Sequence, residues 1–149
     1  MSFRGTVVPI NPTRETVLGE RCFPDVGAAV DAVGPVDLAV VAVPAPAAVD
    51  VLRAVGGAGI QSAVVITAGV GEAGGEDAAR ERRLRAVAEE PDLDIVGSNS
   101  PGVVSTSVGL EATFGPRGAD PGNVSFTSRW ETFVTAVLDR SADRSLGSR

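Results

Sequence analysis

Four short segments that follow apolar runs carry residue types suited to binding a nucleotide or phosphate group. They combine small residues, prolines and short polar side chains, which let the backbone amides approach a ligand closely. The segments are Asn11-Pro12, Val43-Pro44-Ala45, Thr67-Ala68-Gly69 and Ser98-Asn99-Ser100. Any one of them is explained by the ordinary need for a turn, whereas all of them together predict a pocket without identifying its ligand.

Three side chains near these segments have both a chemical and an ordinary interpretation. Arg14 is placed to contact a phosphate, although a lone arginine is more often a solvated surface residue. Glu72 is more often an acid at the start of a helix than a functional group. Cys22, the single cysteine, cannot form an internal disulfide and is most simply a small, partly buried residue, which agrees with a reducing cytoplasm.

Several common active-site patterns are missing from the sequence. The chain has no histidine, which excludes a histidine base, an imidazole metal ligand or a phosphohistidine within it. The glycine-rich run from Val70 to Gly74 lacks the Gly-Lys-Ser/Thr of a Walker A loop, and no Gly-x-Gly-x-x-Gly follows a strand. No cluster of metal-ligand residues is present, so no metal site is expected.

Alternating apolar runs and helical patterns predict the elements that position the four segments. Short β-branched runs predict strands, and the run from Leu38 to Val43 is typical of a strand buried on both faces of a parallel sheet. Helical spacing and capping signals predict helices between the strands. Asp25 is expected to cap the first helix and Gly34-Pro35 to end it, Val49, Leu52 and Val55 to form one stripe of the second, and Pro91 to end the third. The stretch from Thr13 to Pro24 is expected to be irregular. The predicted strands are Thr6–Ile10, Leu38–Val43, Ser62–Thr67 and Leu93–Val96, and the predicted helices span 25–33, 46–55 and 76–90.

Successive βαβ units place their strands parallel in one sheet, so the ends of the strands converge on one edge. The predicted fold class is therefore α/β. Beyond Gly102 the pattern changes, and we expect a loop-like region to Gly122 with a short strand near Glu111 to Phe114. Asn123–Thr127 is predicted to be a strand, and the stretch from Trp130 to Arg144 a helix with one apolar side.

Composition limits the partners of this 149-residue chain. The formal net charge of −6 disfavours nonspecific binding to nucleic acid or to an anionic membrane. No apolar run is as long as a membrane span, and the start of the chain lacks the apolar core of a signal peptide. We therefore expect a cytoplasmic protein that binds neither nucleic acid nor a membrane.

The order of these motifs resembles the CoA-binding domain of the NDP-forming acyl-CoA synthetases. That family includes the ADP-forming acetate–CoA ligases and the alpha subunits of succinyl-CoA ligase. The resemblance covers about Phe3 to Asp139 and rests on short motifs in the same order. They are Gly5–Pro12, Asp37–Ala45, Ala63–Gly69 with Glu72 and Gly74, Gly97–Gly102, Ala112–Phe114, Gly122–Ser128 and Thr135–Asp139.

The resemblance implies a Rossmann-like domain that holds the 3′-phospho-ADP part of coenzyme A at the strand ends. Carried over to this chain, Asn11, Pro12 and Arg14 match the loop near the CoA phosphates. Pro44 and Ala45 match the loop on the adenine side. Thr67, Ala68 and Gly69 match the third strand end, and Asn99 matches the asparagine near the reactive end of CoA.

The chain departs from the family pattern in three places. The family's first strand, glycine loop and helix have no counterpart, although that strand would be central, between the strands matching Thr6–Ile10 and Asp37–Val43. The family's Ser-Gln-Ser-Gly turn is replaced after Ser128 by Arg129-Trp130-Glu131-Thr132. The later domain with the phosphorylated histidine also has no counterpart.

We therefore expect residues 1–122 to be a partial CoA-binding domain that lacks its first βα unit. Residues 123–149 are expected to begin a second, flavodoxin-like domain of the kind found in succinyl-CoA synthetase. The expected function is that of a CoA-binding segment of an ADP-forming ligase, inactive alone, with CoA as its ligand and the remaining ligase domains or subunit as partners. The alternatives are a stand-alone CoA- or nucleotide-binding regulatory module and a non-functional gene fragment.

Overall fold

The computed structural model describes residues 3–67, 76–89, 92–114 and 121–128, together with residues 132, 134, 136 and 137. The chain divides into two compact units. We call Thr6–Asn99 the sheet unit and Met1–Gly5 with Ser100–Arg149 the hairpin unit. The boundary between these two units, after Asn99, differs from the predicted domain boundary after residue 122. The predicted domain boundary stays a prediction.

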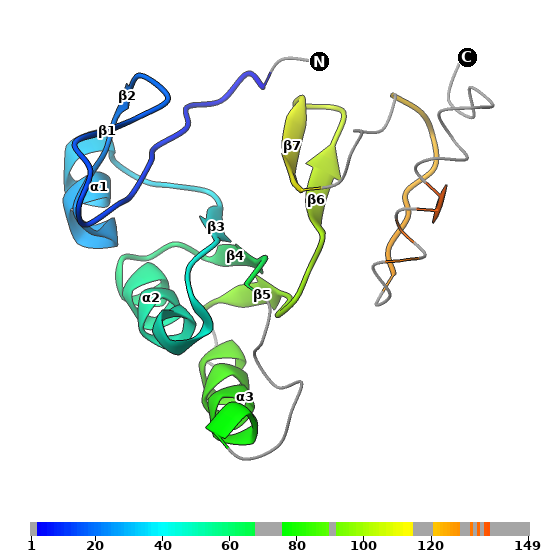
Figure 1. The fold of residues 1–149 in the computed structure, drawn as a ribbon. Helices are drawn as coiled ribbons and strands as arrows, with labels where there is room; N and C mark the ends of the chain where they lie inside the picture. The colour runs from blue at the N-terminus through cyan, green and yellow to red at the C-terminus, as the bar shows by residue number, and fades with distance from the viewer. Residues whose placement is uncertain are drawn as a thin grey trace. The chain divides into compact units, whose positions relative to one another are not determined.

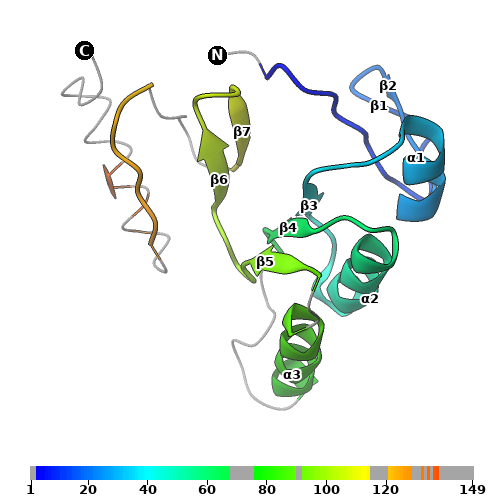
Figure 2. The same ribbon diagram turned by 180° about the vertical axis from the view of Figure 1, so that it is seen from behind.

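The centre of the sheet unit is a parallel sheet of three strands in the order β3-β4-β5. The strands are β3 (Ala39–Val41), β4 (Ser62–Val65) and β5 (Asp94–Val96). Helices α2 (Ala45–Gly57) and α3 (Glu76–Ala88) connect them in sequence. In both views of the ribbon these helices lie on the same side of the sheet (Figures 1 and 2). The α/β fold with consecutive βαβ units is confirmed.

The core lies between this sheet and its helices. The predicted apolar stripe of α2 is confirmed, because Val49, Leu52 and Val55 are all buried. They pack in one cluster with Val65 of β4 and Val87 of α3. Small β-branched strand residues leave room for the helices to approach the sheet closely, which is why a chain with few aromatic residues can form this core.

Helix α1 (Val26–Val33) begins and ends as its sequence predicts. The side chain of Asp25 accepts a hydrogen bond from the backbone N–H of Ala28 at 2.8 Å, which is the contact of an N-cap residue. Gly34 follows with a φ of 86° and donates its N–H to the carbonyl of Val30. Val26 and Val30 contribute to the same core cluster as α2, so α1 extends the helical layer.

The stretch between residues 13 and 24, expected to be irregular, contains a hairpin. Strand β1 (Thr16–Val17) pairs antiparallel with β2 (Glu20–Arg21) across the turn Leu18-Gly19. Both turn residues have positive φ, 50° and 87°, as a type I′ hairpin turn requires. Leucine is rarely found in that conformation, which explains why the sequence did not predict the turn.

The segment Thr6–Ile10 is not a strand, contrary to expectation. Its ladder contact is an isolated parallel bridge between Ile10 and Phe23. The N–H of Phe23 donates to the carbonyl of Pro9, and the N–H of Asn11 donates to the carbonyl of Phe23. Pro9 itself has no N–H to donate, so the pairing does not extend towards the N-terminus.

The hairpin unit contains β6 (Gly102–Ser105) and β7 (Leu110–Thr113), which pair antiparallel. The expected strand near Glu111 is therefore confirmed one residue earlier, and the expectation of a loop was wrong for residues 103–105, which belong to β6. The predicted strand Asn123–Thr127 was also wrong, since these residues carry no ladder pairing. A strand needs a ladder partner, and no backbone ladder is formed by Asn123–Thr127 among the described residues.

Of the predicted C-terminal helix, the described residues Thr132, Val134, Ala136 and Val137 are helical. The remainder of that helix lies outside the described residues. So do the glycine-rich run after Thr67 and Pro91, the residue predicted to end α3. No helix among the described residues is long and apolar enough to cross a membrane.

Candidate functional site

The first group of predicted site residues lines an open hollow in the sheet unit. Asn11, Pro12 and Arg14 border this hollow, which has a volume of about 560 Å³. Its wall is completed by residues of the loop and of the following hairpin, namely Thr13, Glu15, Thr16, Arg21, Cys22 and Pro24. The predicted phosphate loop is therefore part of a concave surface.

The loop at Asn11 is held by its own side chain. The Oδ1 atom of Asn11 accepts hydrogen bonds from both the backbone N–H and the hydroxyl of Thr13, each at 3.0 Å. This is an Asx turn, in which a short side chain replaces a backbone acceptor. The turn orders the backbone that leads into Arg14.

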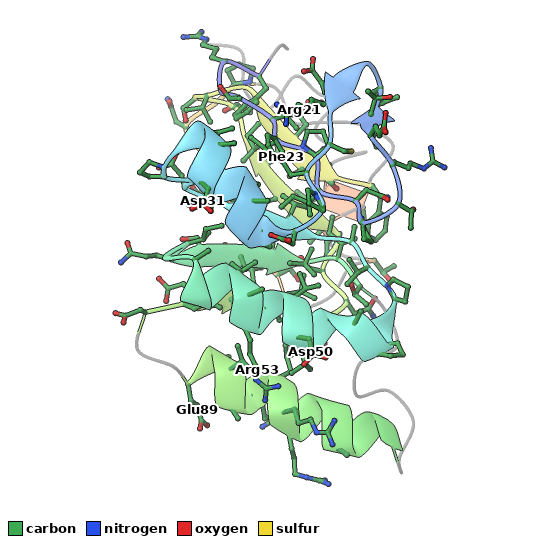
Figure 3. The ribbon with its side chains drawn as sticks, turned by 90° about the vertical axis from the view of Figure 1, so that its left-hand side faces the viewer. Arg21, Phe23, Asp31, Asp50, Arg53 and Glu89 are labelled. Atoms are coloured by element: carbon green, nitrogen blue, oxygen red, sulfur yellow. The ribbon has the colours of Figure 1, made fainter. Side chains whose placement is uncertain are left out.

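Arg21 is a pocket residue that the sequence did not single out. It returns to the hollow because the β1–β2 hairpin folds the chain back after the Leu18-Gly19 turn. Its guanidinium carbon lies 5.1 Å from the centre of the Phe23 ring, a cation–π contact that Figure 3 shows beside the hairpin. The hollow thus has two arginines, Arg14 and Arg21, against one carboxylate, Glu15. This charge balance favours an anionic ligand.

The second group of predicted residues lies at the ends of the parallel strands. Pro44 is the N-cap of α2 and Ala45 is its first residue. No acidic residue occupies the first turn of α2, and no side chain caps it. The first turn of α2 therefore offers the positive end of its macrodipole no acidic side chain of its own.

Thr67, directly after β4, is 7% exposed, and its hydroxyl is hydrogen bonded to the backbone of Val43. The carbonyl of Thr67 accepts the N–H of Asn99 at 3.0 Å. Three of the predicted strand ends, at Pro44, Thr67 and Asn99, are thus joined through Thr67. Ala68 and Gly69 lie outside the described residues.

Two unusual backbone conformations shape the end of β5. Gly97 has a φ of 115°, and a Cβ atom there would collide with the carbonyl oxygen of Val65. Only glycine lets this turn pass so close to β4. Asn99 follows with a φ of 54°, a left-handed conformation that asparagine tolerates better than most residues.

One structural prediction about this region was wrong. The strand Leu38–Val43 was expected to be buried on both faces, but Val40 is 45% exposed. Helices α1, α2 and α3 contribute to a core on the opposite side of the strand, where Val41 is buried. The continuous apolar run from Leu38 to Val43 concealed this asymmetry, because it contains no polar residue to mark the side on which Val40 is exposed.

Comparison with known proteins places the chain in a family. Residues 1–106 match the family model described as a CoA binding domain. The chain is 36% identical over 146 residues to acetate–CoA ligase [ADP-forming] I of Archaeoglobus fulgidus, a match that covers 98% of this chain and 21% of that protein. It is 32% identical to the alpha subunit of acetate–CoA ligase [ADP-forming] II of Pyrococcus furiosus, covering 96% of this chain and 30% of that one.

A solved structure agrees with these sequence matches. The dinucleotide-forming acetyl-coenzyme A synthetase 1 of Ca. Korarchaeum cryptofilum, in complex with phosphate and ADP, matches with a TM-score of 0.85 and 34% identity. The match covers 97% of this chain and 30% of that chain. This chain thus spans between about a fifth and a third of the length of these relatives. The matched family model, together with the parallel sheet and its strand ends, shows that the chain belongs to the CoA binding domain family.

Proposed function

We propose that this chain binds coenzyme A through its 3′-phospho-ADP part, with the phosphates at the hollow beside Asn11 and Arg14. The observation that carries this proposal is the arginine-bearing hollow at the predicted phosphate loop, in a chain of the CoA binding domain family. The planar guanidinium groups of Arg14 and Arg21 suit phosphate oxygens, which they can engage through paired N–H donors.

The strand ends supply the second part of the proposed site. The first turn of α2 carries no acidic residue, so its positive end favours an anionic group nearby. Pro44 and Ala45 present short side chains there and allow a flat ring to lie against the backbone. Asn99 is proposed to lie towards the reactive end of CoA, and Ala68 and Gly69 to complete the third strand end.

In its full context the chain is proposed to be the CoA-binding segment of an ADP-forming acid–CoA ligase. The support is the set of relatives, which include both single-chain ligases and separate alpha subunits. The family's phosphohistidine has no counterpart here, because the chain contains no histidine. We therefore propose that the chain does not catalyse ligation alone and that other domains or a subunit complete the reaction. Residues 1–122 would form the CoA-binding part and residues 123–149 the beginning of the next domain.

Binding is tested by titration calorimetry of the full chain with CoA and, separately, with pantetheine, which lacks the nucleotide and its phosphates. Binding of CoA but not of pantetheine is expected. Replacing Arg14 with Gln should weaken CoA binding roughly 10- to 100-fold, the loss typical of a hydrogen bond to a charged group. Raising the ionic strength should weaken CoA binding by the unmodified chain, because salt screens the attraction between the arginines and the phosphates.

A matched control is available on α2. Arg53 is an exposed arginine that pairs with Asp50 at 3.3 Å, outside the hollow (Figure 3). The Arg53→Gln variant removes the same charge from the chain and should bind CoA like the unmodified protein. Equal losses in the Arg14 and Arg53 variants would contradict a phosphate site at Arg14 and indicate a general charge effect.

The proposed lack of ligase activity has its own test. The purified chain is incubated with acetate, CoA and ATP, and the formation of acetyl-CoA and ADP is measured. No product above background is expected from the chain alone. Acetate-dependent formation of both products would overturn this part of the proposal without affecting the CoA-binding part.

A further inference from the structure

The hydroxyl of Thr67 makes two complementary contacts with one residue of the neighbouring strand end. It donates to the carbonyl of Val43 at 2.8 Å and accepts the backbone N–H of Val43 at 3.3 Å. A second carbonyl, that of Val41, lies at 3.5 Å and is the longer alternative for the single hydroxyl proton. The Thr67 side chain is therefore engaged by the protein itself.

Within the described residues, these contacts extend the pairing of the two strands beyond their backbone hydrogen bonds. Among the described residues, the last backbone hydrogen bond between β3 and the end of β4 runs from the N–H of Ile66 to the carbonyl of Val41 at 3.0 Å. Beyond it, Val43 is partly buried, and the Thr67 hydroxyl is the group among the described residues that pairs with both its N–H and its carbonyl. Leaving such backbone groups unpaired is costly. The Thr67 hydroxyl satisfies both groups, as a paired backbone residue would.

The residue that follows explains why this position needs to be held. Pro44 has no N–H, so it cannot extend the ladder, and it begins α2 without a side-chain cap. The backbone of Thr67 also receives the N–H of Asn99 at 3.0 Å. Thr67 thus connects the segment between β3 and α2 with the segment that follows β5.

We propose that Thr67 is a positioning residue that fastens the Val43-Pro44 and Asn99 strand ends in the arrangement that receives the ligand. This inference rests on the proposed function for its ligand, but the fastening itself is independent of any ligand. It assigns the Thr67 hydroxyl to the protein backbone, so the ligand would meet the loops that Thr67 holds and not the hydroxyl itself.

The test compares Thr67→Val, which keeps the shape and loses the hydroxyl, with Thr67→Ser, which keeps the hydroxyl. Backbone amide hydrogen exchange at Val43 is measured by NMR in the full chain without ligand. We expect Val43 exchange to become about tenfold faster in the valine variant and to stay near that of the unmodified chain in the serine variant. Thr6→Val, which removes the hydroxyl of an exposed threonine, should leave Val43 exchange unchanged.

CoA affinity provides the second readout. Loss of one such hydrogen bond predicts roughly three- to tenfold weaker binding in the valine variant, with recovery in the serine variant. Weaker binding with unchanged Val43 exchange would overturn the positioning role and indicate direct contact with the ligand. Unchanged Val43 exchange in all variants would overturn the fastening itself.

Two further outcomes separate this inference from the proposed function. If the unmodified chain does not bind CoA, the proposed function fails, while the exchange rates still support or overturn the fastening. If the valine variant does not fold, Thr67→Ala and Thr67→Ser replace it, since both lose the methyl group and only serine keeps the hydroxyl. Equal Val43 exchange in that pair would overturn the proposal.

Discussion

The two faces of the β3–β4–β5 sheet have the same kind of residue and different surroundings. One face, which we call the helix-covered face, carries Val41, Ala63 and Val65, all buried in the cluster with the helices. The other, the valine face, carries the paired residues Val40, Val64 and Val96. Val40 and Val96 are 45% and 51% exposed, while Val64 on the central strand is 2% exposed.

Residue type alone does not decide burial in this sheet. Successive strand residues point to opposite faces, so a continuous apolar run supplies apolar side chains to both faces. The helices that connect β3, β4 and β5 contribute their apolar stripes to only one core cluster. The helix-covered face should therefore dominate the stability of the sheet unit, and changes on the valine face should matter less.

The largest effect is expected from Leu52→Ala on α2. Leu52 is fully buried against the helix-covered face, so the substitution leaves a cavity in the core. We expect a loss of about 2–5 kcal/mol in the free energy of unfolding, measured by urea denaturation. A loss below about 1 kcal/mol would mean that α2 does not form the main cover of this face.

The second-largest effect is expected when the same valine-to-alanine substitution is made on each of the two faces and the losses of stability are compared. Val65→Ala removes the same atoms as Val40→Ala, but only Val65 is buried among helices. We expect a loss of about 1.5–3 kcal/mol for Val65 and less than about 1 kcal/mol for Val40 in the same denaturation experiment. Equal losses would contradict the difference between the faces.

A smaller effect is expected at the start of α1, which extends the helical layer. Asp25→Ala removes the side-chain cap on the N–H of Ala28 and should cost about 1 kcal/mol. Asp31→Ala is the control on the same helix, where Asp31 is exposed near the C-terminal end (Figure 3). Removing a negative charge there should leave stability unchanged or raise it by a few tenths of a kcal/mol. Equal destabilisation in a thermal melt of both variants would contradict a specific cap.

The smallest effect is expected from the double variant Val40→Thr and Val96→Thr. Both residues are about half exposed, and threonine keeps their shape and their preference for strands. We expect a change in unfolding free energy within about 0.5 kcal/mol. A loss well above that value would show that the valine face is covered in solution, which would remove the contrast between the faces.

Local signals predicted much of this fold. Asp25 and Gly34 marked both ends of α1, and the spacing of Val49, Leu52 and Val55 identified the buried stripe of α2. These features depend on residues close together in the chain. The β1–β2 hairpin was missed because Leu18 is an unusual residue for a positive φ, and β6 because the hairpin that pairs it with β7 carried no recognised turn signal.

The residues of the candidate site also fall into those that local sequence identified and those that it did not. Asn11, Pro12 and Arg14 were identifiable as a loop after an apolar run, and the structure places them around a hollow. Arg21 could not be assigned to that hollow from the sequence, because its place there depends on how the hairpin returns. The role of Thr67 towards Val43 links residues 24 positions apart, which no local pattern encodes.

The sequence by itself determined the order of strands and helices from α1 to β5 and their α/β class. It did so because capping, helical periodicity and β-branched runs act over a few residues. Only the tertiary structure decided which face of the sheet is covered, which arginines share a hollow and where the Thr67 hydroxyl is engaged. Those outcomes depend on contacts between distant segments, and their free energies belong to the packed arrangement and not to any single stretch of the chain.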